Sequence, residues 1–224
     1  MTSTPVLFLS GAGLPAWIWD GVRAFLAGES AVAPRPSAPD ASLDEYARAA
    51  LEAAPGERFV VVAHSSGGVV AARLLGLAPE RVRGLVALAA VLPRPGESFV
   101  RAMPLPRRLV LSALMRVAGT RPPESSVRGS LAGGLPPEVQ DGLVADLVPE
   151  SQRYFRDRVA PWTAPADSLY VPTERDEELP LPLQRRFAVL LTGTASPLPT
   201  GHLPMLEDPG AVVAAIGTLP TGRQ

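Results

Sequence analysis

The chain has 224 residues, a formal net charge of −1 and 46% hydrophobic residues, which fits one globular domain with a sizeable core. No long run of like charge occurs, so the composition gives no sign of a nucleic-acid partner. The sequence has no cysteine and no lysine, which excludes disulfides, thiol catalysis and lysine chemistry. The two histidines, His64 and His202, are too few for a multi-histidine metal site, so we expect neither a metal nor another cofactor.

The ends and the apolar segments of the sequence argue against a membrane location. The segment before Ser10 lacks the positively charged region of a signal peptide. The longest apolar stretch, at 84–92, is far shorter than the roughly 20 residues that span a bilayer. We expect a cytoplasmic protein with a small-molecule substrate and no membrane partner, and either a monomer or a homodimer is compatible with the sequence.

Short apolar segments typical of strands alternate with segments of helical periodicity along most of the chain. The predicted strands cover residues 6–9, 31–33, 59–63, 85–90, 168–171 and 187–192. The predicted helices cover residues 17–28, 42–54, 67–78 and 210–219. Ser42 followed by Glu45 matches a capping box, and Asp208 before Pro209 matches the start of the last helix. Alternation of this kind predicts an α/β fold in one domain, 1–224, with a mostly parallel sheet and helices on both faces.

The alternation stops between residues 93 and 166. This segment is rich in proline and arginine, carries helical patterns at 105–118, 137–147 and 150–159, and contains no evident strand. We predict that 93–166 is a mainly helical lid inserted into the domain, rather than a domain of its own.

One predicted strand ends in the letters AHSSGG, at residues 63–68, and a helical pattern follows at once. This is the context of a nucleophile elbow, where a serine occupies a strained strand-to-helix turn between small residues and beside the helix N-terminus. Ser65 fits the motif G-x-S-x-G with Ala63 in the first small position, whereas Ser66 would place the bulky His64 there. We therefore predict Ser65 as the nucleophile; a glycine-softened turn with incidental serines is the alternative.

A serine hydroxyl needs a neighbouring base, and the base needs a carboxylate. His64 adjoins Ser65 on the elbow and points away from it, so His202, in the loop before the last helix, is the predicted base. The loop after strand 168–171 supplies the acid, and its distance from the strand end favours Asp176. The other acidic residues of that loop are Glu174, Glu177 and Glu178.

The turn after the first strand, Ser10-Gly11-Ala12-Gly13, consists of small residues that let backbone approach a ligand closely. We predict an oxyanion hole made by the backbone N–H groups of Ala12 and Ser66. A simple glycine turn is the alternative.

The chain resembles the α/β-hydrolase superfamily over nearly its whole length, and more narrowly the small-esterase branch that includes plant methylesterases and hydroxynitrile lyases. The resemblance lies in GAGLPAWIWDGV near the start, AHSSGG at the elbow, YVPTERDEELPLPLQRRF at the acid loop, and GHLPMLEDP around the last histidine. It implies the α/β-hydrolase fold, with Ser65, Asp176 and His202 in the positions of the triad.

The sequence also departs from that branch. Ser10 stands where the branch has a histidine, and the elbow begins with alanine. Leu203 follows His202 and no lysine is present, so we do not expect cyanohydrin cleavage by a lysine-dependent mechanism. The chain is short for the family, and we expect the leading edge strands of the fold to be missing.

Three functions are compatible with these residues. The first is hydrolysis of a small, largely apolar ester through an acyl-enzyme. The second uses the same site as a lyase that eliminates a carboxylate such as acetate, or as a cyclising acyltransferase in specialised metabolism. The third is a ligand-binding member of the fold without chemistry. In each case, the residues that we expect to line the substrate pocket are in the lid: Phe99, Met103, Tyr154 and Trp162.

Overall fold

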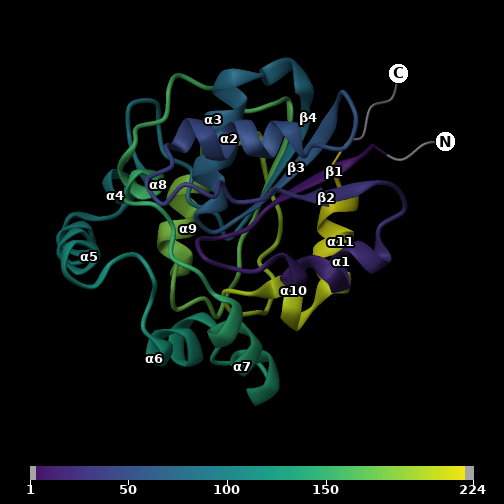
Figure 1. The fold of residues 1–224 in the computed structure, drawn as a ribbon. Coiled ribbons are helices and arrows are strands. Elements are labelled where there is room, and N and C mark those ends of the chain that lie inside the picture. The colour runs from purple at the N-terminus through teal and green to yellow at the C-terminus, as the bar shows by residue number, and fades with distance from the viewer. Residues whose placement is uncertain (1–3, 220–224) are drawn as a thin grey trace.

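The fold is built on a six-stranded sheet in which each strand pairs in parallel with its neighbours, in the order β2-β1-β3-β4-β5-β6. The computed structural model describes residues 4–219, and Figure 1 shows their arrangement. The strands are β1 (Val6–Leu9), β2 (Ser30–Val32), β3 (Phe59–His64), β4 (Val82–Leu88), β5 (Asp167–Val171) and β6 (Gly193–Thr194). The predicted α/β class with a mostly parallel sheet is confirmed.

Helices surround the sheet. In chain order they are η1 (Ala16–Trp19), α1 (Asp20–Phe25), α2 (Leu43–Glu52), α3 (Gly67–Leu77), η2 (Pro79–Arg81), α4 (Phe99–Ala102), α5 (Leu105–Ala118), α6 (Glu124–Ser126), η3 (Val127–Leu131), α7 (Pro137–Asp146), α8 (Gln152–Arg156), α9 (Leu181–Ala188), α10 (Pro204–Glu207) and α11 (Pro209–Gly217).

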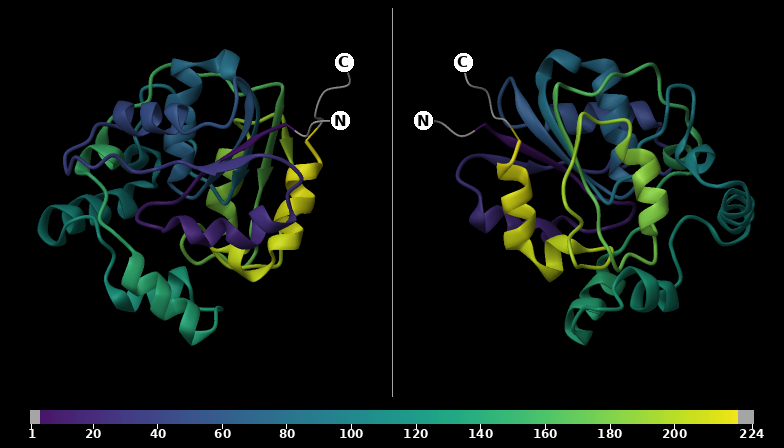
Figure 2. Two further views of the ribbon diagram at one scale, coloured as in Figure 1. Left: turned by 45° about the vertical axis from the view of Figure 1, so that its right-hand side comes forward. Right: turned by 180° about the vertical axis from the view of Figure 1, so that it is seen from behind.

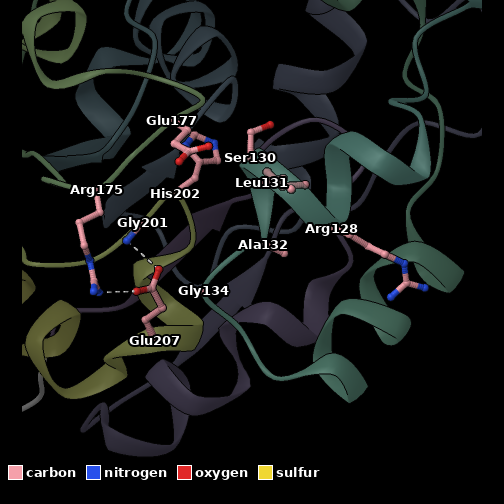
Figure 3. A pocket seen from close by; sticks show the side chains of 12 residues that line it. Arg128, Ser130, Leu131, Ala132, Gly134, Arg175, Glu177, Gly201, His202 and Glu207 are labelled. Atoms are coloured by element: carbon pink, nitrogen blue, oxygen red, sulfur yellow. Dashed lines mark hydrogen bonds and ion pairs between the residues drawn. The ribbon is translucent and has the colours of Figure 1, made fainter.

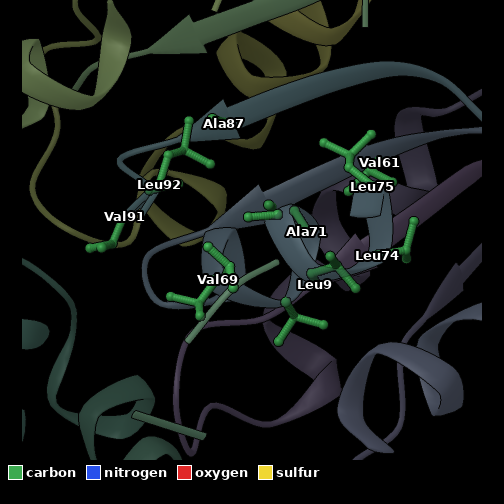
Figure 4. Packing of buried hydrophobic residues seen from close by; sticks show 14 of the residues in the cluster. Leu9, Val61, Val69, Ala71, Leu74, Leu75, Ala87, Val91 and Leu92 are labelled. Carbon is green, nitrogen blue, oxygen red and sulfur yellow. The ribbon is translucent and has the colours of Figure 1, made fainter. Parts of the chain in front are cut away.

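Two apolar cores lie on opposite faces of the sheet, because successive side chains of a strand point to opposite faces. In β1, Leu7 and Leu9 join the core under α2, α3 and α9, whereas Val6 and Phe8 join the core under α1, α10 and α11. Figure 4 shows part of the first core, where side chains of α3 pack on β3 and β4. Burial on both faces explains why the strands are continuous apolar runs rather than alternating ones.

Two predicted helix starts are confirmed in detail. The Ser42 side chain accepts a hydrogen bond from the Glu45 N–H, and the Glu45 carboxylate accepts one from the Ser42 N–H, which is the capping box at the start of α2. Asp208 caps α11 by accepting from the Ala211 N–H at 2.8 Å.

The strand predicted at 187–192 is wrong. Helix α9 extends through Ala188, and the strand that follows, β6, has only two residues, Gly193 and Thr194. The apolar letters Phe187 and Ala188 are the end of a helical face that also buries Leu183, four residues before Phe187. The apolar residues at the start of 187–192 therefore continue the buried face of α9 and do not form a buried strand.

Two further boundaries differ from the prediction. The helix predicted at 17–28 is a 3-10 turn, η1, followed by a short α1 that ends where Leu26 becomes extended, with ψ 135°. The strand predicted at 85–90 begins earlier, at Val82, and ends at Leu88, because Ala89 turns into the left-handed region with φ 43°.

The segment 93–166 contains α4 to α8 and no strand among its described residues. Figures 1 and 2 show its teal helices α5, α6 and α7 at the periphery of the molecule, away from the sheet. The chain then returns to the body of the molecule along 147–151, forms α8 and reaches β5 after residues 157–166. Within residues 4–219, no helix combines the length and the apolar character that crossing a bilayer requires.

Candidate active site

The turn after β3 brings the backbone of three elements into contact. Ser65 has φ 52°, a left-handed conformation that a non-glycine residue adopts only under constraint. A Cβ on Gly67 would lie 2.4 Å from the carbonyl oxygen of Leu9, and one on Gly68 would lie 2.4 Å from that of Val91. Only glycine permits this approach, so the start of α3 can pack against the end of β1 and the segment that follows β4, and hold Ser65 above the sheet.

The structure brings Ser65, His202 and Asp176 together in one hydrogen-bonded chain. His202 Nε2 lies 2.9 Å from Ser65 Oγ, and His202 Nδ1 lies 2.8 Å from Asp176 Oδ2. The carboxylate accepts the Nδ1–H, which leaves Nε2 as the acceptor for the Ser65 hydroxyl proton. This is the tautomer that a general base for Ser65 requires.

Asp176 occupies a buried and fully bonded position. Its Oδ1 accepts from the Leu179 N–H at 2.7 Å, and its Oδ2 also accepts from Thr173 Oγ1 at 3.1 Å. Burial acts to raise the pKa of Asp176, but the charge of His202 and these hydrogen bonds outweigh it and hold the pKa below the ordinary value. The carboxylate is therefore ionised at neutral pH.

The other acidic residues of the same loop have different surroundings. Glu174 and Glu177 are exposed. Glu178 is half-buried and accepts a hydrogen bond from the Ser130 hydroxyl in η3. Asp176 is thus the carboxylate of the loop that contacts His202.

His64 plays a part that the sequence did not suggest. It is fully buried, and its Nε2–H donates to the backbone carbonyl of His202 at 2.8 Å. Burial, together with the neighbouring His202, lowers the pKa of His64 to about 3, so the ring is neutral near pH 7. The residue before Ser65 on the elbow thus fixes the loop that carries His202.

The two predicted oxyanion residues, Ala12 and Ser66, are in contact, but through a side chain. The Ala12 N–H donates to Ser66 Oγ at 2.7 Å, and the hydroxyl of Tyr154, from α8, donates to the same oxygen at 3.0 Å. The Ser66 N–H, at the start of α3, makes no hydrogen bond with the described residues. Nearby, Ser10 accepts from the indole N–H of Trp19 at 3.0 Å.

The same turn is tied to the segment that returns from the lid. The Gly13 N–H donates to Glu150 Oε1 at 2.8 Å, and the Gly13 carbonyl accepts from the Val148 N–H at 3.1 Å. Glu150 is 7% exposed and also binds Arg35 Nε at 2.6 Å and the Tyr46 hydroxyl at 2.6 Å. These partners are far apart in sequence, so no local pattern could have identified Glu150.

A cavity of about 480 Å³ opens beside His202 (Figure 3). Its walls come from η3 and the loop after it, from the acid loop and from the histidine loop. Arg175 and Glu207 form an ion pair of 3.0 Å in this wall, and Glu207 also accepts from the Gly201 N–H at 2.7 Å. The cavity is therefore mixed in character, with one side formed by the outer face of the His202 loop.

The four lid residues predicted to line the substrate pocket are not part of the wall of this cavity. Phe99 stacks edge-on against Phe155 with 5.3 Å between ring centroids, Met103 is buried in the core, and the Trp162 indole donates to the Pro93 carbonyl at 2.9 Å. Tyr154 borders a smaller cavity of about 30 Å³ between α2, α8 and the end of β1. The assignment of a substrate to these four lid residues stays a prediction.

The chain is similar to known hydrolases in sequence. The sequence pattern described as "Alpha/beta hydrolase family" matches residues 6–216. A protein of Oryza sativa subsp. indica described as "Probable esterase PIR7A" is 40% identical over 106 residues, which are 41% of this chain and 40% of that protein. The match thus spans about two fifths of the length of this curated relative.

Solved structures share the fold at low sequence identity. An extracellular alpha/beta-hydrolase from a Paenibacillus species superposes with a TM-score of 0.79 at 14% identity, covering 99% of this chain and 100% of that one. The methylesterase MES16 from Arabidopsis superposes with a TM-score of 0.73 at 18% identity, covering 96% of this chain and 97% of that one. Each of these likenesses covers nearly the whole chain and shows that the fold is shared.

Proposed function

The chain belongs to the alpha/beta hydrolase family of enzymes, and we propose that it is a serine esterase that cleaves a small ester through Ser65, His202 and Asp176. The observation that carries the proposal is the continuous hydrogen-bonded chain from the Ser65 hydroxyl through His202 to Asp176, with distances of 2.9 and 2.8 Å. The relatedness to a probable esterase and the fold shared with a methylesterase favour an ester over an amide or a peroxide.

The proposed reaction begins with attack by Ser65 Oγ on the ester carbonyl, while His202 Nε2 takes the hydroxyl proton. Asp176 holds the imidazole in place and stabilises the positive charge that it gains. The proton then passes from His202 to the leaving alkoxide, which departs as the alcohol. A water molecule, activated by the same imidazole, cleaves the acyl-serine and releases the carboxylic acid.

The negative charge on the carbonyl oxygen develops next to the start of α3. Ser66 is the N-cap of α3, so its N–H, which has no acceptor within residues 4–219, and the positive end of the helix dipole are next to Ser65 and can stabilise this charge. Each donor of such a hole contributes about 3–4 kcal/mol to the stability of the transition state.

The substrate that we propose is small and largely apolar. Buried side chains of α4 and α8, such as Phe155, belong to the same apolar core as α3, and the Tyr154 hydroxyl of α8 reaches Ser66. This apolar core next to Ser66 favours an apolar acyl group, and the mixed cavity beside His202 suits the alcohol side.

The test is turnover of p-nitrophenyl acetate by purified wild type, Ser65→Ala and Ser125→Ala. Ser125 is an exposed serine of α6, so its variant controls for the same chemical change away from the site. We expect Ser65→Ala to lose at least about a thousandfold in kcat. Equal turnover by Ser65→Ala and wild type, with both proteins folded by circular dichroism, would exclude the acyl-serine.

Incorporation of oxygen from water into the product distinguishes hydrolysis from elimination and from acyl transfer at the same site. Turnover of an ester in ¹⁸O-water places the label in the released acid if an acyl-enzyme is hydrolysed. Release of unlabelled acid would indicate elimination of a carboxylate, and a product that contains both halves of the substrate would indicate cyclising acyl transfer.

A further inference from the structure

The backbone N–H of Ala12 already has an acceptor. An oxyanion hole in which this amide binds the substrate oxygen directly requires the amide to be free, yet Ser66 Oγ lies 2.7 Å from the nitrogen. The Ser66 side chain therefore occupies the amide that the sequence predicted as a direct donor to the substrate oxygen.

The hydrogen-bonding capacity of Ser66 explains what this side chain can do. A serine hydroxyl has two lone pairs and one proton. The two lone pairs face two donors, the Ala12 N–H at 2.7 Å and the Tyr154 hydroxyl at 3.0 Å. The hydroxyl proton has no acceptor among the described residues, so this donor is not used within the protein.

We propose that the hydroxyl of Ser66 is an oxyanion donor: Ala12 and Tyr154 hold its oxygen, and its proton is donated to the carbonyl oxygen of the substrate. This proposal rests on the esterase function proposed above. The oxyanion then receives the N–H and the O–H of the same residue, and the Ala12 amide acts on it through the hydroxyl rather than directly.

The surroundings make Ser66 a better donor than an ordinary serine. Two donors that point at its oxygen polarise the O–H bond, since hydrogen bonds in a chain strengthen one another. Burial raises the pKa of the Tyr154 phenol, so this phenol keeps the proton that it donates to Ser66. Ser66 is 2% exposed and His202 is 3% exposed, so both groups act where water competes little.

Replacement of Ser66 by alanine tests whether the oxyanion donor is the Ser66 hydroxyl or the Ala12 amide, because the two cases predict opposite changes in kcat. If the hydroxyl is a donor, Ser66→Ala lowers kcat on p-nitrophenyl acetate by roughly 100-fold and leaves KM within about twofold. If the hydroxyl only occupies the Ala12 amide, its removal frees that amide, and kcat stays the same or rises. A decrease in kcat of less than about tenfold overturns the proposal.

Binding of a trifluoromethyl ketone gives a readout that a merely structural role would not change. Such a ketone adds to Ser65 and places an oxyanion in the hole without turnover. We expect its inhibition constant to rise in Ser66→Ala by about the same factor as kcat/KM falls, while Ser125→Ala stays at the wild-type value. An unchanged inhibition constant in Ser66→Ala would overturn the proposal.

Tyr154→Phe removes the hydroxyl that donates to Ser66. It keeps the ring that packs against Tyr46 with 4.8 Å between centroids. Loss of the phenol proton weakens the polarisation of Ser66, and we expect a decrease in kcat of about 3- to 10-fold, smaller than in Ser66→Ala. No decrease in Tyr154→Phe would contradict the role assigned to the phenol.

Failure of this inference is distinct from failure of the proposed function. Equal turnover by wild type and Ser65→Ala overturns both proposals. Loss of turnover in Ser65→Ala with full turnover in Ser66→Ala leaves the esterase in place and removes only the hydroxyl donor.

Discussion

The turn at the end of β3 and helix α5 of the lid differ in how their residues pack. At the turn, Gly67 and Gly68 lie so close to neighbouring carbonyl groups that neither has room for a methyl group. In α5, five large apolar side chains face solvent: Leu105, Leu109, Val110, Leu114 and Val117. The backbone around Ser65 is thus fixed by contacts on all sides, whereas one face of α5 is fixed only by its own helix.

This difference in packing indicates which region must hold its side chains in a fixed position. Catalysis by a serine depends on geometry within a fraction of an ångström, and a tightly packed turn provides it. We propose that the lid shapes the space around a ligand, a role that tolerates wider variation in side-chain position. We therefore expect substitutions around the β-strand ends to have large effects and those on the outer face of the lid to have small ones.

The largest expected effect comes from Asp176→Asn. The amide would favour the wrong tautomer of His202, and we expect kcat to fall by roughly 10⁴-fold, as measured by steady-state hydrolysis of p-nitrophenyl acetate. Glu178→Gln is the matched control on the lid side of the same loop, because Glu178 bonds to Ser130 of η3. A similar loss in both variants would contradict the assignment of the acid.

The next largest effect is on the free energy of unfolding, and it distinguishes Gly67 at the turn from Gly129 in the lid. A Cβ on Gly67 would lie 2.4 Å from the Leu9 carbonyl oxygen, so Gly67→Ala must displace backbone, and we expect a loss of about 3 kcal/mol or more in the free energy of unfolding. In the lid, a Cβ on Gly129 would meet none of the described atoms within 4 Å. Gly129→Ala should change stability by less than about 1 kcal/mol in the same urea titration; equal losses would remove the contrast between the regions.

A smaller effect is expected from His64 and depends on pH. In the folded protein burial keeps His64 neutral down to a pKa of about 3, whereas in the unfolded chain it binds a proton near pH 6.5. Its contribution to stability is therefore complete above pH 6.5 and is lost as the pH falls toward 3.

Between pH 7 and pH 5, wild type should lose about 2 kcal/mol more of its unfolding free energy than His64→Gln. Urea titrations at the two pH values measure this difference. The pKa of Asp176 does not interfere, because its ordinary value is 3.8 and the fold lowers it further. Parallel pH profiles for the two proteins would show that His64 is not the group responsible.

The smallest effect is expected on the outer face of α5. Val117 is 90% exposed, and Val117→Ser should change both stability and kcat by less than about 0.5 kcal/mol. On the inner face of the same helix Met115 is 3% exposed, and Met115→Ala should cost about 2 kcal/mol or more in thermal or urea unfolding. A large loss in Val117→Ser would show that this face is covered in solution.

The elbow and the helix caps were predictable because their signals are local. Ser65 follows a buried strand and precedes two glycines, and Ser42 lies three residues before Glu45, so each pattern carries its own geometry. His202 was found by elimination, since only two histidines are present. The same reasoning failed at 187–192, where a short apolar run fits a strand and a helix equally well.

The rest of the site depends on contacts between distant segments. The hydroxyl of Ser66 meets Ala12 and Tyr154, which are 54 and 88 residues away in sequence. The predicted donors Ala12 and Ser66 are thus in contact, but the local sequence around them does not indicate that the contact is made by the Ser66 side chain. The role of Glu150 was hidden for the same reason.

The carboxylate of Glu150 makes the lid difficult to remove or exchange. Glu150 lies in the lid segment between α7 and α8, and it is the buried counter-ion of Arg35 and the acceptor for the Gly13 amide. Excision of residues 93–151 would remove the carboxylate partner of Arg35, whose side chain is 29% exposed, and the acceptor of the buried Gly13 N–H. Grafting of a foreign lid to alter selectivity therefore has to preserve the native junction at 147–151, with new sequence inserted upstream of it.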